Sequence, residues 1–304
     1  MLSPGILRVF VLLSLLLTSG CATIRKLNPI ESHTLEARRL TQQAEAAIHK
    51  SEWNDAETKL VRAIERCPED TRARSVLADV LWERGARSAA VEQKARSIQL
   101  AGGRDAWELT ELGQMQLSTG NFAQALQHAE EAISQNGELA DAWTLKGFAL
   151  NVLDRPDDAL GAFYRSLSIR NDDSRTRMEI ASIYRAKGEL RRALAILGDA
   201  PSDTTEFNSS YPDACYLRGL LLGELNRPSD AALAFASAKE RGCTAPDLLF
   251  HLANAQLTAG ERLAARATLA DANQMEHAPE VRVALAELGK QLELSQSTET
   301  PTWR

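Results

Sequence analysis

Histidine, the side chain best suited to acid–base and metal chemistry near neutral pH, occurs only five times in this sequence of 304 residues, at scattered positions. The histidines stand at positions 33, 49, 128, 251 and 277. His277 lies between Glu276 and Glu280, a set that could hold a metal ion, although such a cluster in a turn is usually solvated. His128 and Glu131 are spaced to form an ordinary surface pair on a helix. We therefore predict no metal site and no cofactor.

Neighbouring carboxylates do not indicate a catalytic pair either. Asp157-Asp158 and Asp172-Asp173 precede apolar helical patterns, where carboxylates accept hydrogen bonds from the free N–H groups of a first helical turn. No phosphate-binding loop, dinucleotide-binding loop, nucleophile elbow or HExxH motif is present. We predict that the protein is not an enzyme. The alternative is a ligand-binding or catalytic site assembled from distant residues, with His251, Cys215 and Glu224 as its best candidates.

The N-terminal stretch has the layout of a secretory signal. Arg8 is its only charge, Val9 to Leu17 form an apolar run, and the small residues Thr18 to Gly20 lead into Cys21. Nine helical residues rise only about 14 Å, which is too short for a hydrocarbon core of about 30 Å. A transmembrane anchor is therefore not predicted.

Small residues that run directly into a cysteine resemble a bacterial lipoprotein signal. The resemblance implies cleavage between Gly20 and Cys21 and attachment of lipid, including palmitate, to Cys21. One departure is that Thr18 stands three residues before the cysteine, where such signals usually have leucine. In enterobacterial lipoproteins, a residue such as Ala22 after the cysteine favours the outer membrane. The implied location is the cell envelope, on the periplasmic side of the outer membrane; a soluble secreted protein is the alternative.

Net charge and cysteine number exclude two further classes of protein. The formal charge of −6 argues against nucleic-acid binding, which depends on clustered lysine and arginine. Beyond Cys21 the cysteines are Cys67, Cys215 and Cys243, an odd number without a C-x-x-C motif. We interpret them as small buried apolar residues. A disulfide between Cys215 and Cys243 stays open, because an oxidising envelope would permit it.

Two series of small residues repeat along the chain in the same register. The first is Ala56, Ala90, Ala125, Ala159, Ala193, Ala231 and Ala265. The second lies twelve residues earlier and is Ala44, Ala78, Gly113, Gly147, Ala181, Gly219 and Ala253. Apolar residues recur around them at three- and four-residue spacing, which predicts helices. Each unit is therefore predicted to be a pair of helices that approach closely at their small residues. A glycine or asparagine between them, as at Gly85, Gly120, Gly188, Asn226 and Gly260, would end the first helix.

The repeat length and its marker residues resemble the tetratricopeptide repeat family, whose unit has about 34 residues. Trp143, Gly147, Ala159 and Phe163 stand where the family has Trp, Gly, Ala and Phe. The resemblance covers residues 37–279. It implies an all-α fold, a right-handed superhelical solenoid of about seven helical hairpins, followed by a C-terminal capping helix.

The repeat register also predicts the domain organisation. A signal peptide at 1–20 and a lipidated tether at 21–36 precede the solenoid at 37–279, a capping helix at 280–294 and a disordered tail at 295–304. The units lie near 37–70, 71–105, 106–139, 140–173, 174–211, 212–245 and 246–279. The alanine spacing rises from 34 to 38 residues between the fifth and sixth units. We predict that these extra residues form a loop, Pro201 to Asp213, which could be a contact loop or a tolerated insertion.

The family resemblance implies that the first helix of each hairpin lines a concave groove that binds a partner segment. The candidates on these helices are Trp82, Trp107, Thr144, Phe148, Asn151, Met178, Ser182, Arg185, Tyr216, Phe250 and Asn254. Some of them could instead be core residues, because a helix in a solenoid has two buried sides. The stretch Arg165 to Arg192 carries eight basic and four acidic residues. It could bind an acidic segment or form an ordinary surface with ion pairs.

These observations predict a membrane-anchored adaptor of the bacterial cell envelope that binds another envelope protein. Lipoproteins with such repeats help to assemble pili and secretins or recruit cell-wall enzymes, and nothing in this sequence chooses among these roles. A homo-oligomeric structural protein of the envelope is an alternative.

Overall fold

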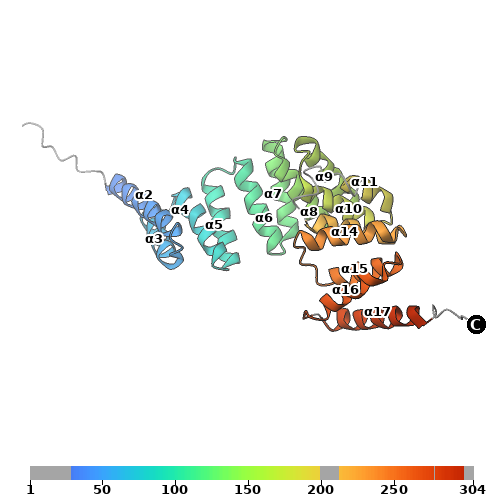
Figure 1. Ribbon diagram of the computed structural model, residues 1–304. Helices are drawn as coiled ribbons and strands as arrows, with labels where there is room; N and C mark the ends of the chain where they lie inside the picture. The colour runs from blue at the N-terminus through green and yellow to red at the C-terminus, as the bar shows by residue number, and fades with distance from the viewer. Residues whose placement is uncertain (1–28, 199–211, 277, 298–304) are drawn as a thin grey trace, which may run out of the picture. The chain divides into compact units, whose positions relative to one another are not determined.

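The computed structural model describes residues 29–198, 212–276 and 278–297. Within these ranges the chain forms fifteen α-helices and no strand (Figure 1). The predicted all-α class is therefore confirmed.

The structure consists of two compact units, and the helices are numbered through both. The first unit, Met1–Asp105, contains α2 (Pro29–Ile48), α3 (Trp53–Arg66), α4 (Thr71–Glu83) and α5 (Arg87–Leu100). The second unit is Ala106–Arg304. It contains α6 (Ala106–Ser118), α7 (Phe122–Gln135), α8 (Ala140–Val152), α9 (Pro156–Ile169), α10 (Ser174–Ala186), α11 (Leu190–Leu197), α13 (Pro212–Glu224), α14 (Pro228–Glu240), α15 (Leu248–Thr258), α16 (Arg262–Ala272) and α17 (Pro279–Ser297).

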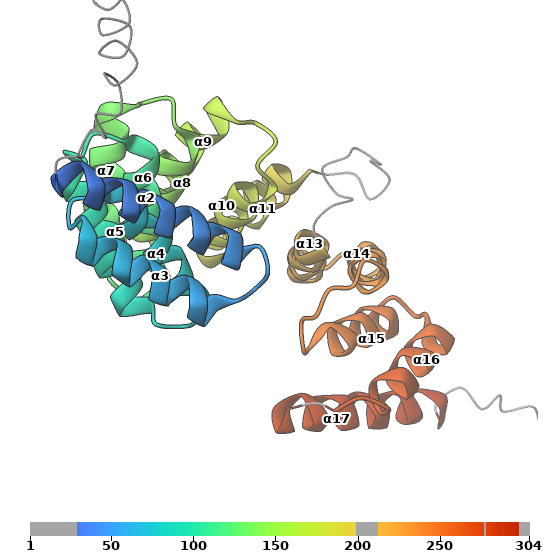
Figure 2. The ribbon, with the colours of Figure 1, turned by 90° about the vertical axis from the view of Figure 1, so that its left-hand side faces the viewer.

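Consecutive helices of the described ranges pack in pairs, and we number the pairs as hairpins 1 to 7. They are α2 with α3, α4 with α5, α6 with α7, α8 with α9, α10 with α11, α13 with α14, and α15 with α16. The last helix, α17, packs on both α15 and α16 (Figure 2). The predicted seven hairpins and C-terminal capping helix are thus confirmed.

Several predicted segments lie wholly or largely outside the described residues. These are the signal peptide at 1–20, the lipid site at Cys21, and all but the last two residues of the loop Pro201 to Asp213. The tether predicted at 21–36 overlaps α2, which begins at Pro29, and the tail predicted at 295–304 overlaps the last residues of α17.

The two small-residue series mark the places where paired helices touch. All seven alanines of the first series have no exposed surface. The four alanines and three glycines of the second series are also buried. Small side chains let helix backbones approach closely, so the repeat register in the sequence is the register of helix packing.

Where the second series has glycine, a side chain from a neighbouring helix occupies the space. A Cβ atom at Gly147 would lie 2.5 Å from the ring of Phe163, and one at Gly219 would lie 2.5 Å from the ring of Phe235. At Gly113 the neighbour is Leu145, also at 2.5 Å. The glycines are therefore required by packing, since no Cβ fits at such distances.

Each hairpin turns at one residue with a left-handed backbone. Glycine holds this place in hairpins 2, 3, 5 and 7, as predicted for Gly85, Gly120, Gly188 and Gly260, with φ between 74° and 82°. Asn226 has φ 57° in hairpin 6, again as predicted. The sequence analysis did not identify Ser51 in hairpin 1 or Asp154 in hairpin 4, which have φ 60° and 58°. Asp and Asn tolerate this conformation better than most residues do.

Asp173 confirms the interpretation of its carboxylate as a helix cap. It accepts a hydrogen bond from the Thr176 N–H at 3.1 Å, and Asp70 does the same for the Ala73 N–H at 3.0 Å. Such caps contribute about 1 kcal/mol each to helix stability.

The Gly147–Phe163 contact leads to a test of the packing argument. We expect Gly147→Ala to lower the free energy of unfolding by about 1–3 kcal/mol, because the added Cβ overpacks the hairpin. Gly161→Ala is the matched control, since a Cβ at this exposed glycine of α9 meets no atom within 4 Å. That change should stabilise α9 by about 0.5–1 kcal/mol. Denaturant unfolding measures both, and equal effects would contradict the packing argument.

Half-buried Glu179 on α10 predicts a pH-dependent change in stability. Burial raises the pKa of Glu179, and the nearby Arg175 offsets this only in part. A carboxyl whose pKa is raised on folding contributes stability at low pH and loses it as the pH rises through the raised value. Glu179→Gln should therefore raise the melting temperature at pH 7 and leave it unchanged below the ordinary range of glutamate. Thermal unfolding across this pH range checks the sign, and a lower melting temperature at pH 7 would contradict it.

Candidate binding site

A pocket of about 300 Å³ lies within the second unit, between the first helices of hairpins 5, 6 and 7. Arg185 of α10 lines one side, and Gly223 and Glu224 of α13 line the next. His251 and Asn254 of α15 complete the opposite side. This volume is at the lower end for small-molecule sites, so it suits one or two side chains of a partner.

Aromatic packing forms the inner wall of the pocket. Phe235 of α14 fills the space above Gly219, and its ring stacks on the imidazole of His251 with centroids 5.6 Å apart and planes 18° apart. Tyr216 and Phe250 contact the same imidazole at centroid distances of 6.0 and 5.2 Å. Three rings from three helices therefore hold His251 in place.

Two successive side-chain contacts link Tyr216 to Asp247 and Asp247 to His251. The Tyr216 hydroxyl donates to Asp247 Oδ1 at 2.7 Å, and Asp247 Oδ2 lies 3.3 Å from His251 Nε2. Burial and the bond to Asp247 raise the pKa of Tyr216, so the phenol stays protonated. Burial alone would raise the pKa of Asp247, but the hydrogen bond from Tyr216, its own backbone and His251 lower it overall. Asp247 is therefore a carboxylate at neutral pH.

An ion pair between hairpins 5 and 6 borders the pocket. Both Nε and Nη2 of Arg185 contact one oxygen of Glu224, Oε1, at 2.7 and 2.6 Å. More than a third of each side chain is exposed, so the pair contributes no more than about 1 kcal/mol. Such a pair can be rearranged by an incoming charged or hydrogen-bonding group.

Gly223 provides open space at the pocket. It lies in α13, is exposed, and a Cβ placed there would meet no atom within 4 Å. Glycine costs about 0.5–1 kcal/mol relative to alanine inside a helix, so no packing requirement in the described structure explains it. The absent side chain leaves room for the backbone or side chain of a partner.

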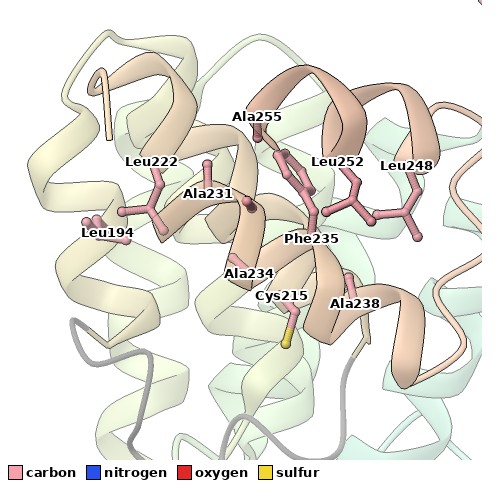
Figure 3. Close-up of a cluster of buried hydrophobic side chains, with 11 residues drawn as sticks. Leu194, Cys215, Leu222, Ala231, Ala234, Phe235, Ala238, Leu248, Leu252 and Ala255 are labelled. Atoms are coloured by element: carbon pink, nitrogen blue, oxygen red, sulfur yellow. The ribbon is translucent and has the colours of Figure 1, made fainter. Parts of the chain in front are cut away.

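The structure brings some of the predicted groove residues together here. Arg185 and Asn254 line the pocket, and Tyr216 and Phe250 support it through His251. His251 and Glu224, which the sequence offered only for a hidden catalytic site, also line it. Cys215, the third of that group, belongs instead to a buried apolar cluster with Phe235 (Figure 3).

Two other predicted groove residues, Thr144 and Phe148, contact neighbouring helices and do not line the pocket. The Thr144 hydroxyl lies 2.7 Å from the Ser166 hydroxyl and 3.3 Å from that of Thr176, so it joins helices inside the fold. Phe148 packs edge-on against the buried Phe163 and is covered by Arg175, whose guanidinium lies 4.8 Å from the ring.

Four further candidates lie outside the lining of the pocket. Met178 packs against the core of hairpins 5 and 6, Ser182 is exposed and Asn151 is half-buried. Trp107 has 54 % of its surface exposed and donates to Glu111 at 3.1 Å.

Trp82 belongs to the first unit, where Arg87 lies over its ring at 5.0 Å.

Acidic residues from other helices and connections neutralise much of the basic stretch Arg165 to Arg192. Arg165 pairs with Glu138 at 2.7 Å and Arg170 with Asp141 at 2.8 Å. Lys187 pairs with Asp157. The structure therefore favours an ordinary surface with ion pairs over a site for an acidic segment.

Three further observations concern the described residues only. No group of three His, Cys, Asp or Glu side chains in them could hold a metal ion, and the cluster around His277 includes a residue outside them. None of their helices combines the length and apolar character needed to cross a bilayer. Cys67, Cys215 and Cys243 are all unbridged thiols.

Sequence reasoning missed Gly223 and the clustering of His251 with three other rings. Gly223 carries a usable signal, because it stands inside a helical pattern but outside both small-residue series. The ring cluster has no such local signal, since its members come from three helices of two hairpins.

Comparisons with known proteins agree with this architecture. The family model described as "Tetratricopeptide repeat" matches residues 41–106 and 110–176. A tetratricopeptide repeat protein from Parabacteroides merdae is similar in structure, with a TM-score of 0.63 and 16 % identity, covering 84 % of this chain and 98 % of its own. Pseudomonas aeruginosa PilF is similar with a TM-score of 0.57 and 16 % identity, covering 74 % of this chain and 99 % of its own.

At these identities the structural likeness concerns the fold alone, and no curated protein matches the sequence. The family match, the repeated helix pairs and the solved structures agree with one another. Residues 41–106 and 110–176 therefore carry tetratricopeptide repeats, and the fold of the chain is that of solved tetratricopeptide repeat proteins, which suggests a scaffold for protein–protein interaction.

Proposed function

We propose that this protein is a lipid-anchored adaptor of the bacterial cell envelope that binds a segment of a partner protein at the pocket of hairpins 5 to 7. The observation that carries the proposal is the pocket itself. It combines an apolar wall with an imidazole, an amide and an exposed ion pair, and Gly223 leaves room beside them. Peptide-binding grooves use this combination of apolar anchoring and hydrogen bonding.

The size and chemistry of the pocket support binding over catalysis. Its imidazole is stacked on Phe235 and faces Asp247, and both guanidinium contacts of Arg185 go to Glu224. These groups are positioned to hold a chain by hydrogen bonds and ring contacts. A large side chain seated against His251 would bury apolar area worth about 25 cal/mol per Å².

Filling the pocket should weaken partner binding without damaging the fold. We expect Gly223→Gln to reduce binding about tenfold or more, which corresponds to about 1.4 kcal/mol, because the new side chain enters the space of the partner. The measurement places a photo-crosslinking amino acid at the exposed Asn254 in the cells that make the protein. The crosslinked partner is then quantified in each background.

Gly161→Gln is the control, since both positions are exposed glycines within helices and have open space around them. It should leave the crosslink unchanged, and both variants should melt slightly above the wild type. An undiminished crosslink in Gly223→Gln would refute the assignment of this pocket. A crosslink only to a second copy of the chain would replace the adaptor by a homo-oligomer.

The anchor rests on the sequence around Cys21 and is tested separately. The wild-type protein should begin at Cys21 with acyl groups attached and should sediment with membranes. Cys21→Ser should lack the added acyl mass, because serine has no thiol to receive the lipid. Mass spectrometry of the N-terminal peptide measures this directly. A wild-type N-terminus at another residue without acyl mass would exclude the anchor and leave a secreted protein.

A further inference from the structure

Two cysteines lie at the same end of hairpin 6. Cys215 lies in the first turn of α13 and is buried in the apolar cluster of Figure 3. Cys243 follows the C-terminal end of α14 and packs against the same cluster. Because the two helices of a hairpin are antiparallel, the start of one lies beside the end of the other.

Side-chain contacts link the start of α13 to the segment that follows α14. Arg241 Nη1 donates to Cys215 Sγ at 2.9 Å, and the Cys243 thiol donates to Asp213 Oδ1 at 3.5 Å. Each thiol thus contacts the residue two positions before the other cysteine. The thiols also lie near enough to interact electrostatically. Gly242, with φ 81°, precedes Cys243 and gives this segment freedom to adjust.

The surroundings give the two thiols different roles in thiol–disulfide exchange. Cys243 is the more exposed of the two, so an external disulfide reaches it first. Burial and the neighbouring Asp213 raise the pKa of Cys243, which slows this first attack at neutral pH. Cys215 is buried, so it is placed to react in the second step, after Cys243 has reacted with the oxidant.

We propose that Cys215 and Cys243 form a reversible intramolecular disulfide with a small disulfide oxidant such as oxidised glutathione. The Cys243 thiolate attacks the oxidant, forms a mixed disulfide and releases one thiol of the oxidant. The Cys215 thiolate then attacks Cys243 Sγ and releases the second thiol. Two protein thiols are oxidised, one oxidant disulfide is reduced, and the two protons leave with the released thiols.

The disulfide would act on the segment that supports the pocket. Tyr216 follows Cys215 directly, and its hydroxyl binds Asp247, which in turn faces His251. The bond would therefore tie the start of α13 to the connection between α14 and α15. The oxidation itself does not depend on the proposed function, because it is assigned from the thiols and their contacts alone.

The experiment equilibrates the folded full-length protein with oxidised and reduced glutathione in varying ratio, followed by acid quenching, alkylation and peptide mapping. We expect a peptide pair joined through Cys215 and Cys243, with the mass of two hydrogen atoms lost, that disappears on reduction. Cys67→Ser should leave this product unchanged, whereas Cys215→Ser should leave Cys243 as a glutathione adduct. Full alkylation of both cysteines in the wild type, or an adduct that never closes, would overturn the proposal.

A second measurement does not depend on the serine variants folding well. Closing a loop by a disulfide restricts the unfolded chain, so the oxidised wild type should unfold at a higher temperature than the reduced wild type. Hydrogen exchange should slow in α13 and in the segment after α14, and a reductant should reverse both effects. Unchanged exchange in these segments after oxidation would show that the bond does not form between them.

Discussion

The fold depends on the close approach of two helix backbones at two positions in every hairpin. The seven alanines of one series have no exposed surface, and the alanines and glycines of the other are buried as well. A larger residue at either position would push the helices apart. Since no single hairpin can bury its remaining apolar face, each one packs against its neighbours, and the repeat of small residues becomes a repeat of structure.

The same packing rule builds the candidate binding site. Gly219 lets the ring of Phe235 enter between α13 and α14, and that ring then supports His251. The pocket wall is therefore an extension of the hairpin core rather than a separate feature. In hairpin 4, the corresponding glycine, Gly147, receives Phe163, and Phe148 packs against that ring. The same glycine position of the repeat therefore contributes only to core packing in hairpin 4, whereas in hairpin 6 it also lines the pocket.

Charged residues follow a different pattern, because several of them pair with residues that lie far away in the sequence. The basic stretch Arg165 to Arg192 stands out in the linear sequence, yet Glu138, Asp141 and Asp157 neutralise much of it. Arg185 shares this behaviour through Glu224, but its pair is exposed at the edge of the pocket. Local net charge was therefore a poor guide to the residues that line the pocket, whereas the position of a residue on a first helix was a better one.

The sequence by itself determined the repeat register, the number of hairpins and most of the turn residues, because small residues and left-handed turns are local requirements of helix packing. It also placed Arg185 and Asn254 on first helices, as their positions in the repeat require. Only the tertiary structure decided that they meet Glu224 and His251 in one pocket and that the Thr144 hydroxyl lies beside that of Thr176. The reason is physical: these contacts join side chains from different hairpins, and their distances follow from how successive helix pairs pack, which no local pattern records.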